Sequence, residues 1–179
     1  MDRKNYVILV DKNDRKIGLG EKMKAHDKKN GKLHRAISIF VFNKKGETML
    51  QQRAPDKYHS KGKWSNTCCS HPMSGEKVLT AAHRRLREEM GFDCRMRKVF
   101  EFTYEAEVGS GLREREYDHI IFGRHERNPR INKDEVVDWK WISLPSLKSE
   151  IKKNPEKFTP WLRMMINKVD FHYRKTKAS

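Results

Sequence analysis

The sequence has no run of 18 or more apolar residues, so none of its segments is predicted to cross a membrane as a helix. Its opening stretch turns charged after five apolar residues, which is unlike a secretory signal peptide. No internal repeat and no linker interrupts the 179 residues, which suffice for a hydrophobic core. We therefore expect one domain over 1–179, with its core at about 5–170 and a short basic tail that is frayed.

Cysteine is scarce. The chain has three, an odd number, and two of them, Cys68 and Cys69, are neighbours. Adjacent Cα atoms lie about 3.8 Å apart, below the usual range for a disulfide. We interpret all three as reduced thiols, which indicates a cytoplasmic protein.

Acidic residues are few beside the basic ones, with Asp+Glu 24 against Lys+Arg 40 and a net charge of +16. Such a field attracts anions, whether nucleic acid, acidic membrane or a phosphorylated small molecule. The basic residues are scattered, without a long basic block or a nucleic-acid-binding motif. This distribution favours a charge that serves solubility and electrostatic steering over one that binds nucleic acid. A basic nucleic-acid-binding module without catalysis remains the alternative.

Hydrophobic patterning predicts strands that alternate with a few helices. Strands are expected at 6–11, 36–42, 47–53, 98–108, 114–124 and 136–142, with 36–42 and 47–53 forming a hairpin. Helices are expected before Gly91, at 144–152 behind an N-cap at Ser143, and at 158–173. Runs of strands with helices packed outside predict an α+β fold, a mixed β-sheet sandwich flanked by helices, rather than a doubly wound sheet.

The predicted central helix carries four apolar residues at three- and four-residue spacing: Leu79, Ala82, Leu86 and Met90. Gly91 suits a left-handed C-cap, so Glu88 and Glu89 end the helix beside a turn that can face a metal. The alternative is an ordinary surface helix, because Arg84–Glu88 and Arg85–Glu89 are common i,i+4 pairs. A polar loop with two cysteines and a histidine precedes this helix and favours a functional site.

Five side chains suit one divalent metal ion: His26, His34, His71, Glu114 and Glu116. Glu114 and Glu116 are two apart on a predicted strand and therefore share a face. Five donors exceed the four of a closed structural zinc site and favour a five- or six-coordinate ion. Histidines scattered by chance and a solvated strand face are the alternative explanation.

Cys69 is the candidate acid or base. A free thiol has a pKa near ~8.5, and a nearby metal or cationic group would lower it enough for proton exchange at neutral pH. The alternative is a structural cysteine, which is how we interpret Cys68 and Cys94. Four basic residues on separate segments could flank the site and bind phosphate: Lys22, Arg53, Lys57 and Arg85.

Six motifs in order resemble one family: AHDKKNGKLHRA, QQRAP, KWSNTCCSHP, GEKVLTAAHRRLREEMG, EREYD and FTPWLRMM. Over about Tyr6 to Val169 the chain is similar to the type I isopentenyl-diphosphate Δ-isomerases, which have the Nudix fold. The resemblance implies an isomerase of isoprenoid biosynthesis that interconverts isopentenyl and dimethylallyl diphosphate. The Nudix signature is altered here, with Ser70 in place of its first glycine and Arg85 in place of its first acid. The second change counts against the alternative, a Nudix hydrolase of a diphosphate.

The resemblance also implies roles for individual residues. Cys69, Glu116 and Tyr104 match the catalytic residues, and Trp161 matches the aromatic that faces the isoprenoid carbon. Its alternative is a core position on a helical face shared with Met164 and Met165. The five metal-binding candidates match a His3Glu2 site for Mn²⁺, Mg²⁺ or Zn²⁺, and Glu89 with the Cys69 carbonyl matches a Mg²⁺ site on the diphosphate. The four basic candidates match the diphosphate-binding positions. The expected partner is a small isoprenoid diphosphate, without nucleic acid or membrane, and the chain is expected to be a monomer or weak dimer.

Overall fold

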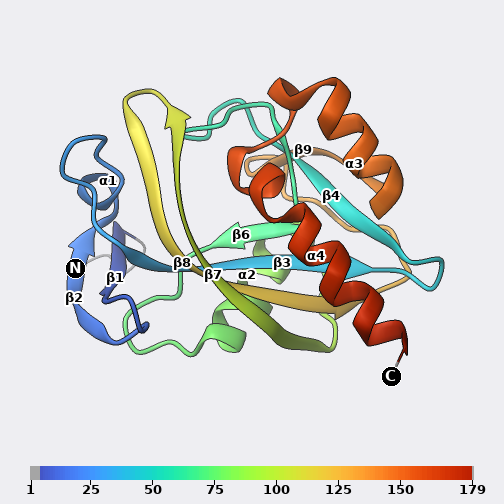
Figure 1. Cartoon of the computed structure of the whole chain (residues 1–179), viewed down its shortest axis with the longest axis horizontal. Coiled ribbons are helices and arrows are strands. Elements are labelled where there is room, and N and C mark those ends of the chain that lie inside the picture. The colour runs from blue at the N-terminus through green and yellow to red at the C-terminus, as the bar shows by residue number, and fades with distance from the viewer. Residues whose placement is uncertain (1–4, 179) are drawn as a thin grey trace.

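The computed structural model describes residues 5–178, in which nine strands form one curled, mixed sheet (Figure 1). In chain order the elements are β1 (Tyr6–Val10), β2 (Lys16–Glu21), α1 (Lys22–Ala25), β3 (His34–Phe42), β4 (Glu47–Arg53), β5 (Trp64–Ser65), β6 (Cys68–Ser70), α2 (Val78–Met90), β7 (Met96–Gly109), β8 (Leu112–Arg124), β9 (Val136–Ser143), α3 (Leu144–Lys153), a 3₁₀ helix (Pro155–Lys157) and α4 (Pro160–Ala178). None of the helices within residues 5–178 combines the length and apolarity that a bilayer crossing needs.

Strand β3 is central because it has partners along both edges. It runs parallel to β8 from His34↔Glu116 onward and antiparallel to β6, where Ser38 lies opposite Cys69. β7 pairs with β8, and β4 pairs with β9 and β5. This pairing joins three segments that are far apart in the sequence, and it sets the register of the polar residues described below.

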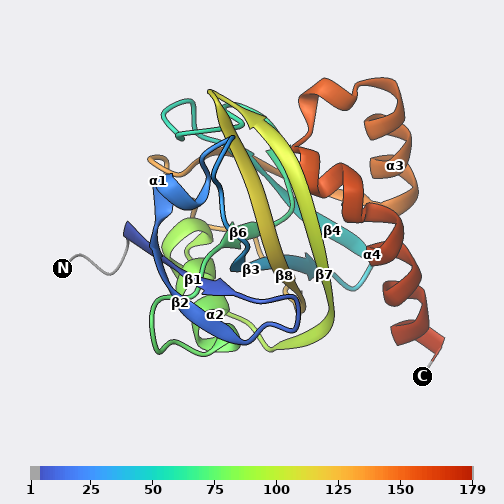
Figure 2. The same cartoon turned by 60° about the vertical axis from the view of Figure 1, so that its left-hand side comes forward.

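The sheet is covered on both faces, and the alternation along β3 shows why. Ile37, Ile39 and Val41 pack in one apolar cluster with Ala82, Leu86 and Met90 of α2. Phe40 and Phe42 point the other way, into a cluster with α3 and α4. Figures 1 and 2 show α2 and α4 on opposite sides of β3. The predicted α+β class, with helices flanking a mixed sheet, is confirmed.

Most predicted elements are confirmed, with bounds that shift by a few residues. The hairpin is wrong in its pairing: β3 and β4 meet only at Phe42↔Thr48, and β4 pairs along its length with β9. The polar loop that holds the cysteines is also wrong, because Cys68–Ser70 is strand β6 of the sheet. Its polar side chains belong to a site, so they do not show the apolar alternation that marks a strand.

Helix α2 ends at Gly91 in the left-handed conformation, as predicted, with φ 70°. Leu79 was expected on the buried face but is 38% exposed, since the buried residues of α2 begin only at Ala81. On α4 the buried stripe leaves out Met164, which is 46% exposed, although Trp161 and Met165 are buried. The prediction of a frayed tail is wrong for the residues up to Ala178, because α4 continues to Ala178. Ser179 lies outside the described residues.

Replacing Gly91 by alanine should lower the free energy of unfolding by more than about 2 kcal/mol. The left-handed conformation alone costs roughly 1–2 kcal/mol for a residue with a Cβ. A Cβ at Gly91 would also lie 2.2 Å from the Arg130 carbonyl oxygen. Gly75 is the matched control, with φ +80° and nothing within 4 Å of its added Cβ. Urea unfolding of the two alanine variants checks this, and equal losses would contradict the role of the Arg130 contact.

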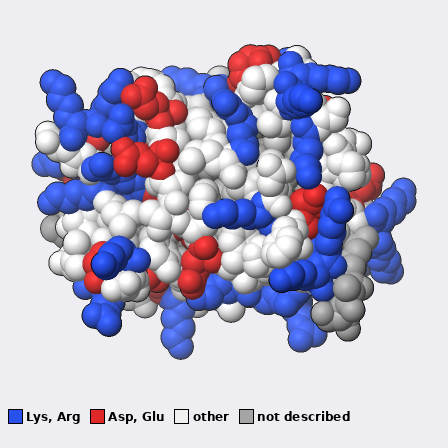
Figure 3. All heavy atoms as spheres, viewed as in Figure 1, with Lys and Arg blue, Asp and Glu red and all other residues white. Residues whose placement is uncertain are grey.

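Basic side chains are spread over the face seen in Figure 3, with acidic ones between them. On that face they do not gather into a single stripe. The arrangement agrees with the scattered basic residues of the sequence.

Candidate active site

The predicted site residues converge on one cavity. Of the thirteen side chains singled out in the sequence, ten line a cavity of about 60 Å³: Lys22, Arg53, Lys57, Cys69, His71, Arg85, Tyr104, Glu114, Glu116 and Trp161. An outer cavity of about 340 Å³ shares Lys22, Lys57, His71 and Arg85 with it. The small inner cavity and the wider, basic outer cavity therefore adjoin each other.

The sheet register brings three of these residues together. Glu116 on β8 lies next to His34 on β3 and opposite Tyr104 on β7. Cys69 lies opposite Ser38, four residues further along β3. A local pattern in the sequence could not place Cys69 near this cluster, because strands whose partners Ser38 and Cys69 are 31 residues apart, and His34 and Glu116 82 residues apart, must first pair.

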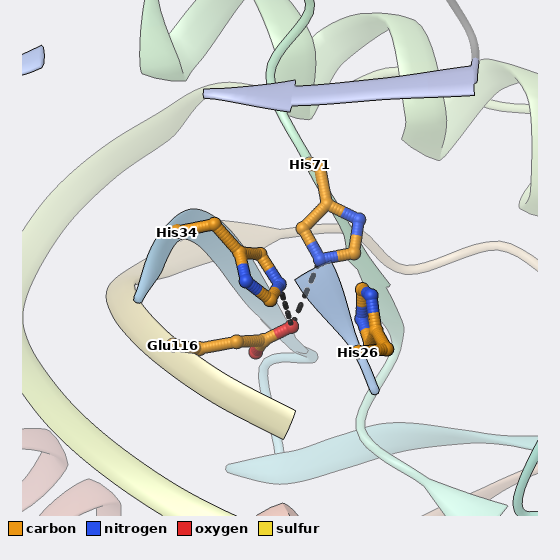
Figure 4. Close-up of side chains that lie close together, drawn as sticks. All are labelled: His26, His34, His71 and Glu116. Carbon is orange, nitrogen blue, oxygen red and sulfur yellow. Dashed lines mark hydrogen bonds and ion pairs between the residues drawn. The ribbon is translucent and has the colours of Figure 1, made fainter. Parts of the chain in front are cut away.

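A group suited to a metal ion includes two residues that line the cavity, His71 and Glu116 (Figure 4). Ligand atoms of His26, His34, His71 and Glu116 all lie within 4.8 Å of one another. Nδ1 of His26 is 2.7 Å from the Lys22 carbonyl oxygen, and Nδ1 of His34 is 2.8 Å from that of Lys32. A carbonyl only accepts, so both Nδ1 atoms carry the proton and both Nε2 atoms keep a lone pair.

These Nε2 atoms are the strongest sign that the group binds metal. In His26 and His34 they are buried and have no hydrogen-bond partner in the part of the chain described, and that of His34 lies 3.6 Å from Oε1 of Glu116. Metal-binding histidines commonly donate their other ring N–H to a backbone carbonyl, which is the arrangement seen here. Two orphaned lone pairs, a third imidazole and a carboxylate therefore fit a divalent ion.

The protonation states also suit a metal. Burial lowers the pKa of His26 to about 4 and that of His71 to about 3, so both imidazoles are neutral near pH 7. Burial would raise the pKa of Glu116, but the neighbouring imidazoles of His34 and His71 hold it well below its ordinary range. Neutral imidazole and ionised carboxylate are the metal-binding forms.

Glu114 lies outside that group of four and bonds to Tyr104 instead. The Tyr104 hydroxyl is 2.8 Å from Glu114 and 2.6 Å from Glu116. One hydroxyl proton cannot serve two ionised carboxylates, so one carboxyl must be protonated. Burial, together with the charge of Glu116, raises the pKa of Glu114 well above its ordinary value, which identifies Glu114 as the protonated one. A cation bound at Glu114 would displace that proton.

Cys69 is partly exposed, and its Sγ has polar neighbours on two sides. The thiol lies 2.9 Å from Oδ1 of Asn66, and Nε1 of Trp161 lies 3.1 Å from Sγ. Burial, and secondarily the charge of Asp118, raises the pKa of Cys69 to about 12. The predicted lowering of this pKa by a nearby metal ion stays a prediction. The protonated thiol is a proton donor on the same cavity that the ionised Glu116 lines.

Four basic side chains surround the entrance. Burial lowers the pKa of Lys22 to about 8, and the nearby charges of Lys57, Arg85 and Arg53 add to the effect. The Arg53 guanidinium lies 5.3 Å from the centre of the Trp161 ring. Lys57 and Arg85 both pair with Glu135, and Arg85 also bonds to Glu88 and Glu89. Positive charges gathered around Lys22, which lower its pKa, favour an anionic ligand.

The comparisons with known proteins agree with this chemistry. The family model of the NUDIX domain matches residues 32–162. Isopentenyl-diphosphate Delta-isomerase 2 of Aromatoleum aromaticum is 52% identical over 165 residues, 92% of this chain and 86% of that protein. Isopentenyl-diphosphate Delta-isomerase 2 of Photorhabdus laumondii is 50% identical over 92% of each. The chain belongs to the isopentenyl-diphosphate Delta-isomerase family.

The fold of this isopentenyl-diphosphate isomerase family member recurs in distant structures. The crystal structure of DR0079 from Deinococcus radiodurans superimposes with a TM-score of 0.76 at 17% identity, covering 91% of this chain and 98% of that one. MutT protein from Methanosarcina mazei superimposes with a TM-score of 0.65, also at 17% identity, covering 81% of this chain and 96% of that one. These likenesses show the fold alone.

In this member of the isomerase family, Glu89 lies apart from the histidines of the metal-binding group. It is buried on α2, bonded to Gln51 and to Arg85, and belongs to neither metal-binding group found among the described residues. Burial would raise the pKa of Glu89, but Arg85 and Lys57 lower it below its ordinary value. Glu89 is therefore an ionised carboxylate that lies among the basic residues of the entrance.

Some residues of the site in this isomerase family member were not predicted. Tyr58 and His59 line the inner cavity, although the segment 54–63 was read only as a basic loop. Asp118 is buried and 2.7 Å from Ser38 Oγ, which in turn lies 3.8 Å from Cys69 Sγ. A signal existed for Asp118, because it continues the period-two series Glu114, Glu116 along β8.

Proposed function

We propose that the chain interconverts isopentenyl diphosphate and dimethylallyl diphosphate by adding a proton at one carbon and removing one at another. The observation that supports this best is the pairing of a protonated thiol, Cys69, with an ionised carboxylate, Glu116, on one small cavity. Moving a double bond needs an acid and a base at separate carbons in a water-poor site.

In the proposed mechanism the Cys69 thiol gives its proton to the terminal CH2 of isopentenyl diphosphate, and positive charge develops at the adjacent tertiary carbon. Glu116 takes a proton from the carbon on the other side, which forms the new double bond. Tyr104 hydrogen-bonds the Glu116 carboxylate and orients it. The thiolate and the protonated carboxyl then exchange protons with solvent, and the resting state returns.

The diphosphate is proposed to lie at the basic entrance. Lys22, Lys57 and Arg85 line the outer cavity, and Arg53 lines the inner one. Arginine forks and lysine point charges bind phosphate oxygens and would keep the diphosphate attached beside a developing cation. We propose Mg²⁺ on the diphosphate, held by Glu89 and the Cys69 carbonyl, and Mn²⁺, Mg²⁺ or Zn²⁺ in the His3Glu2 centre. These ions would neutralise charge and fix the positions of Glu114 and Glu116.

The three cysteines are unpaired, which supports a reducing, cytoplasmic setting, and we expect a monomer or weak dimer.

Trp161 is proposed to stabilise the cation with its indole face. The ring lies in the cavity wall, and its Nε1 contacts Ser65, Asn66 and Cys69, which fixes its orientation. A cation–π interaction of about 2 kcal/mol corresponds to roughly thirtyfold in rate. Turnover should fall in the order Trp, Phe, Leu at position 161, with little change in diphosphate affinity, because the charge exists only in the transition state. Steady-state kinetics check this. Equal turnover of Trp161→Leu and Trp161→Phe, both folded by circular dichroism, would leave the tryptophan a core residue only.

The experiment that tests the function follows products. The purified chain is incubated with isopentenyl diphosphate and Mg²⁺, and both dimethylallyl diphosphate and released phosphate are measured. We expect isomer and no phosphate. Phosphate without isomer would favour a Nudix hydrolase, the alternative that the fold leaves open. If neither product forms, the result would favour a binding protein without catalysis.

A further inference from the structure

A further cavity, which we call the arginine cavity, lies at the opposite end of β3 from the metal-binding histidines. Its volume is about 420 Å³, and it shares no lining residue with the proposed active site. Phe42, which lines it, ends β3, whereas His34 begins that strand. A strand advances about 3.3 Å per residue, so the two ends of β3 lie roughly 26 Å apart. A ligand in the arginine cavity would therefore not touch the proposed active site.

One wall of the arginine cavity is aromatic and buried. It includes Phe42, Phe122 and Tyr173, which are 1%, 6% and 6% exposed. The rings of Phe42 and Tyr173 stack with centroids 4.0 Å apart, and Phe122 meets Phe42 edge to face at 5.1 Å. Because Phe42 and Tyr173 each cover one face of the other, little ring face is left for a planar base to stack on. The wall suits an aliphatic chain better.

Three arginines also line this cavity: Arg95, Arg97 and Arg124. The register of β7 on β8 places them together. Arg97 lies opposite Phe122, and Arg124 is two residues beyond Phe122 on β8, so both share its face of the sheet. Arg95 directly precedes Met96, which pairs with Gly123, and therefore stands across from Arg124. Like charges opposite each other destabilise a sheet, and a bound anion would relieve that repulsion.

The three guanidinium groups have no anionic partner in the protein itself. Within residues 5–178, no hydrogen bond or ion pair joins any of them to another group. The acids on adjoining stretches are already engaged: Asp93 bonds to His83 and Arg87, and Glu126 accepts from the Lys44 amide. Guanidinium forks bind phosphate oxygens in pairs, which makes phosphate the anion that fits this arrangement.

We propose that the arginine cavity is a second ligand site, which takes a small organic diphosphate with a short aliphatic chain. The chain lies against the aromatic wall and the diphosphate on the arginines. Three positive charges exceed the charge of about −2 on a single phosphate group and match a diphosphate more closely. The volume is in the range of small-molecule sites. The competing explanation is a surface hollow with three solvated arginines, in a chain whose net charge is +16.

The test is a titration of the full chain with geranyl diphosphate, followed by the amide signals in the NMR spectrum. The amides of Gly123 and Thr176 report the arginine cavity, and those of Ser70 and His71 report the proposed active site. We expect the Gly123 and Thr176 signals to shift and to saturate. Geraniol and inorganic diphosphate each lack half of the ligand, and AMP has a base in place of the chain. At the same concentrations these three probes should leave both signals nearly unchanged.

Replacing two of the arginines tests their part in the binding. The double variant Arg97→Gln, Arg124→Gln should weaken geranyl diphosphate at the Gly123 signal at least tenfold, because each charge-assisted hydrogen bond contributes about a factor of ten or more. The matched control is Arg127→Gln, since Arg127 is exposed beyond the end of β8 and does not line the cavity. It should bind as the wild type does. All of these side chains are exposed, so the variants should fold.

Four results would overturn the second site: no shift of Gly123 or Thr176 in the wild type, equal shifts with geraniol, stronger binding of AMP, or unchanged affinity in the double variant. Equal shifts with geraniol would mean an apolar hollow, and stronger binding of AMP a nucleotide site. The Ser70 and His71 signals are judged separately, because a diphosphate also suits the entrance of the proposed active site. Failure at the arginine cavity would therefore leave the proposed isomerase function standing.

Discussion

Replacing Cys69 by alanine should lower turnover by roughly two to four orders of magnitude, the usual contribution of a positioned acid or base. Burial raises the pKa of the thiol to about 12, so it enters the reaction with its proton. Alanine has no proton to give. Cys69→Ser keeps a donor, but a hydroxyl is a weaker acid than a thiol and should lose most turnover as well. Diphosphate binding should persist in both, because the basic groups at the entrance are unchanged.

The other two cysteines are the controls for this prediction. Cys68 is buried in the cluster under α2, and Cys94 lies at the far end of the sheet beside Gly123. Cys94→Ser and Cys68→Ser should turn over close to the wild-type rate per folded molecule. Steady-state kinetics with folding checked by circular dichroism decide it. A loss at Cys68 equal to that at Cys69 would show that the wrong thiol has been assigned.

Replacing His71 by asparagine should remove one equivalent of tightly held metal and abolish most activity. An ion that binds only the folded state stabilises it, by about 2.7 kcal/mol when its concentration is a hundred times the dissociation constant. The variant should therefore unfold at a lower temperature than the wild type. A chelator should reduce the difference in unfolding temperature between the two proteins, because it removes the same ion from the wild type.

Elemental analysis and thermal unfolding, each with and without chelator, check the metal prediction. His83→Asn is the matched control and should keep both its metal and its unfolding temperature, since His83 pairs with Asp93 at the surface of α2. Unchanged metal content in His71→Asn and in a second variant, His26→Asn, would contradict the centre.

Strands and helices with strong apolar periodicity were predictable from the sequence. The C-cap at Gly91 and the N-cap at Ser143 follow from local chemistry alone, and the structure confirms them. Pairing of distant strands is not local. It explains why β4, expected to return along β3, pairs with β9 instead.

The candidate site was reached mainly through the family resemblance. Spacing alone put Glu114 and Glu116 on one face of a strand, and β8 confirms that geometry. The protonation state of Cys69 was out of reach, because it depends on how completely other segments bury the thiol. His59 was missed for a similar reason. In sequence it is one histidine in a turn-rich segment, and only folding brings it to Glu114 and Trp161.

The most direct test of the central claim, that a protein acid adds a proton at one carbon while a base removes one at another, is the reaction in D2O followed by NMR. Isopentenyl diphosphate should yield dimethylallyl diphosphate that carries solvent deuterium in its newly formed methyl group, and Cys69→Ala should nearly abolish this product. Dimethylallyl diphosphate free of deuterium would indicate direct transfer of hydrogen between carbons of the substrate. That result would contradict the proton donor and acceptor on which the account depends.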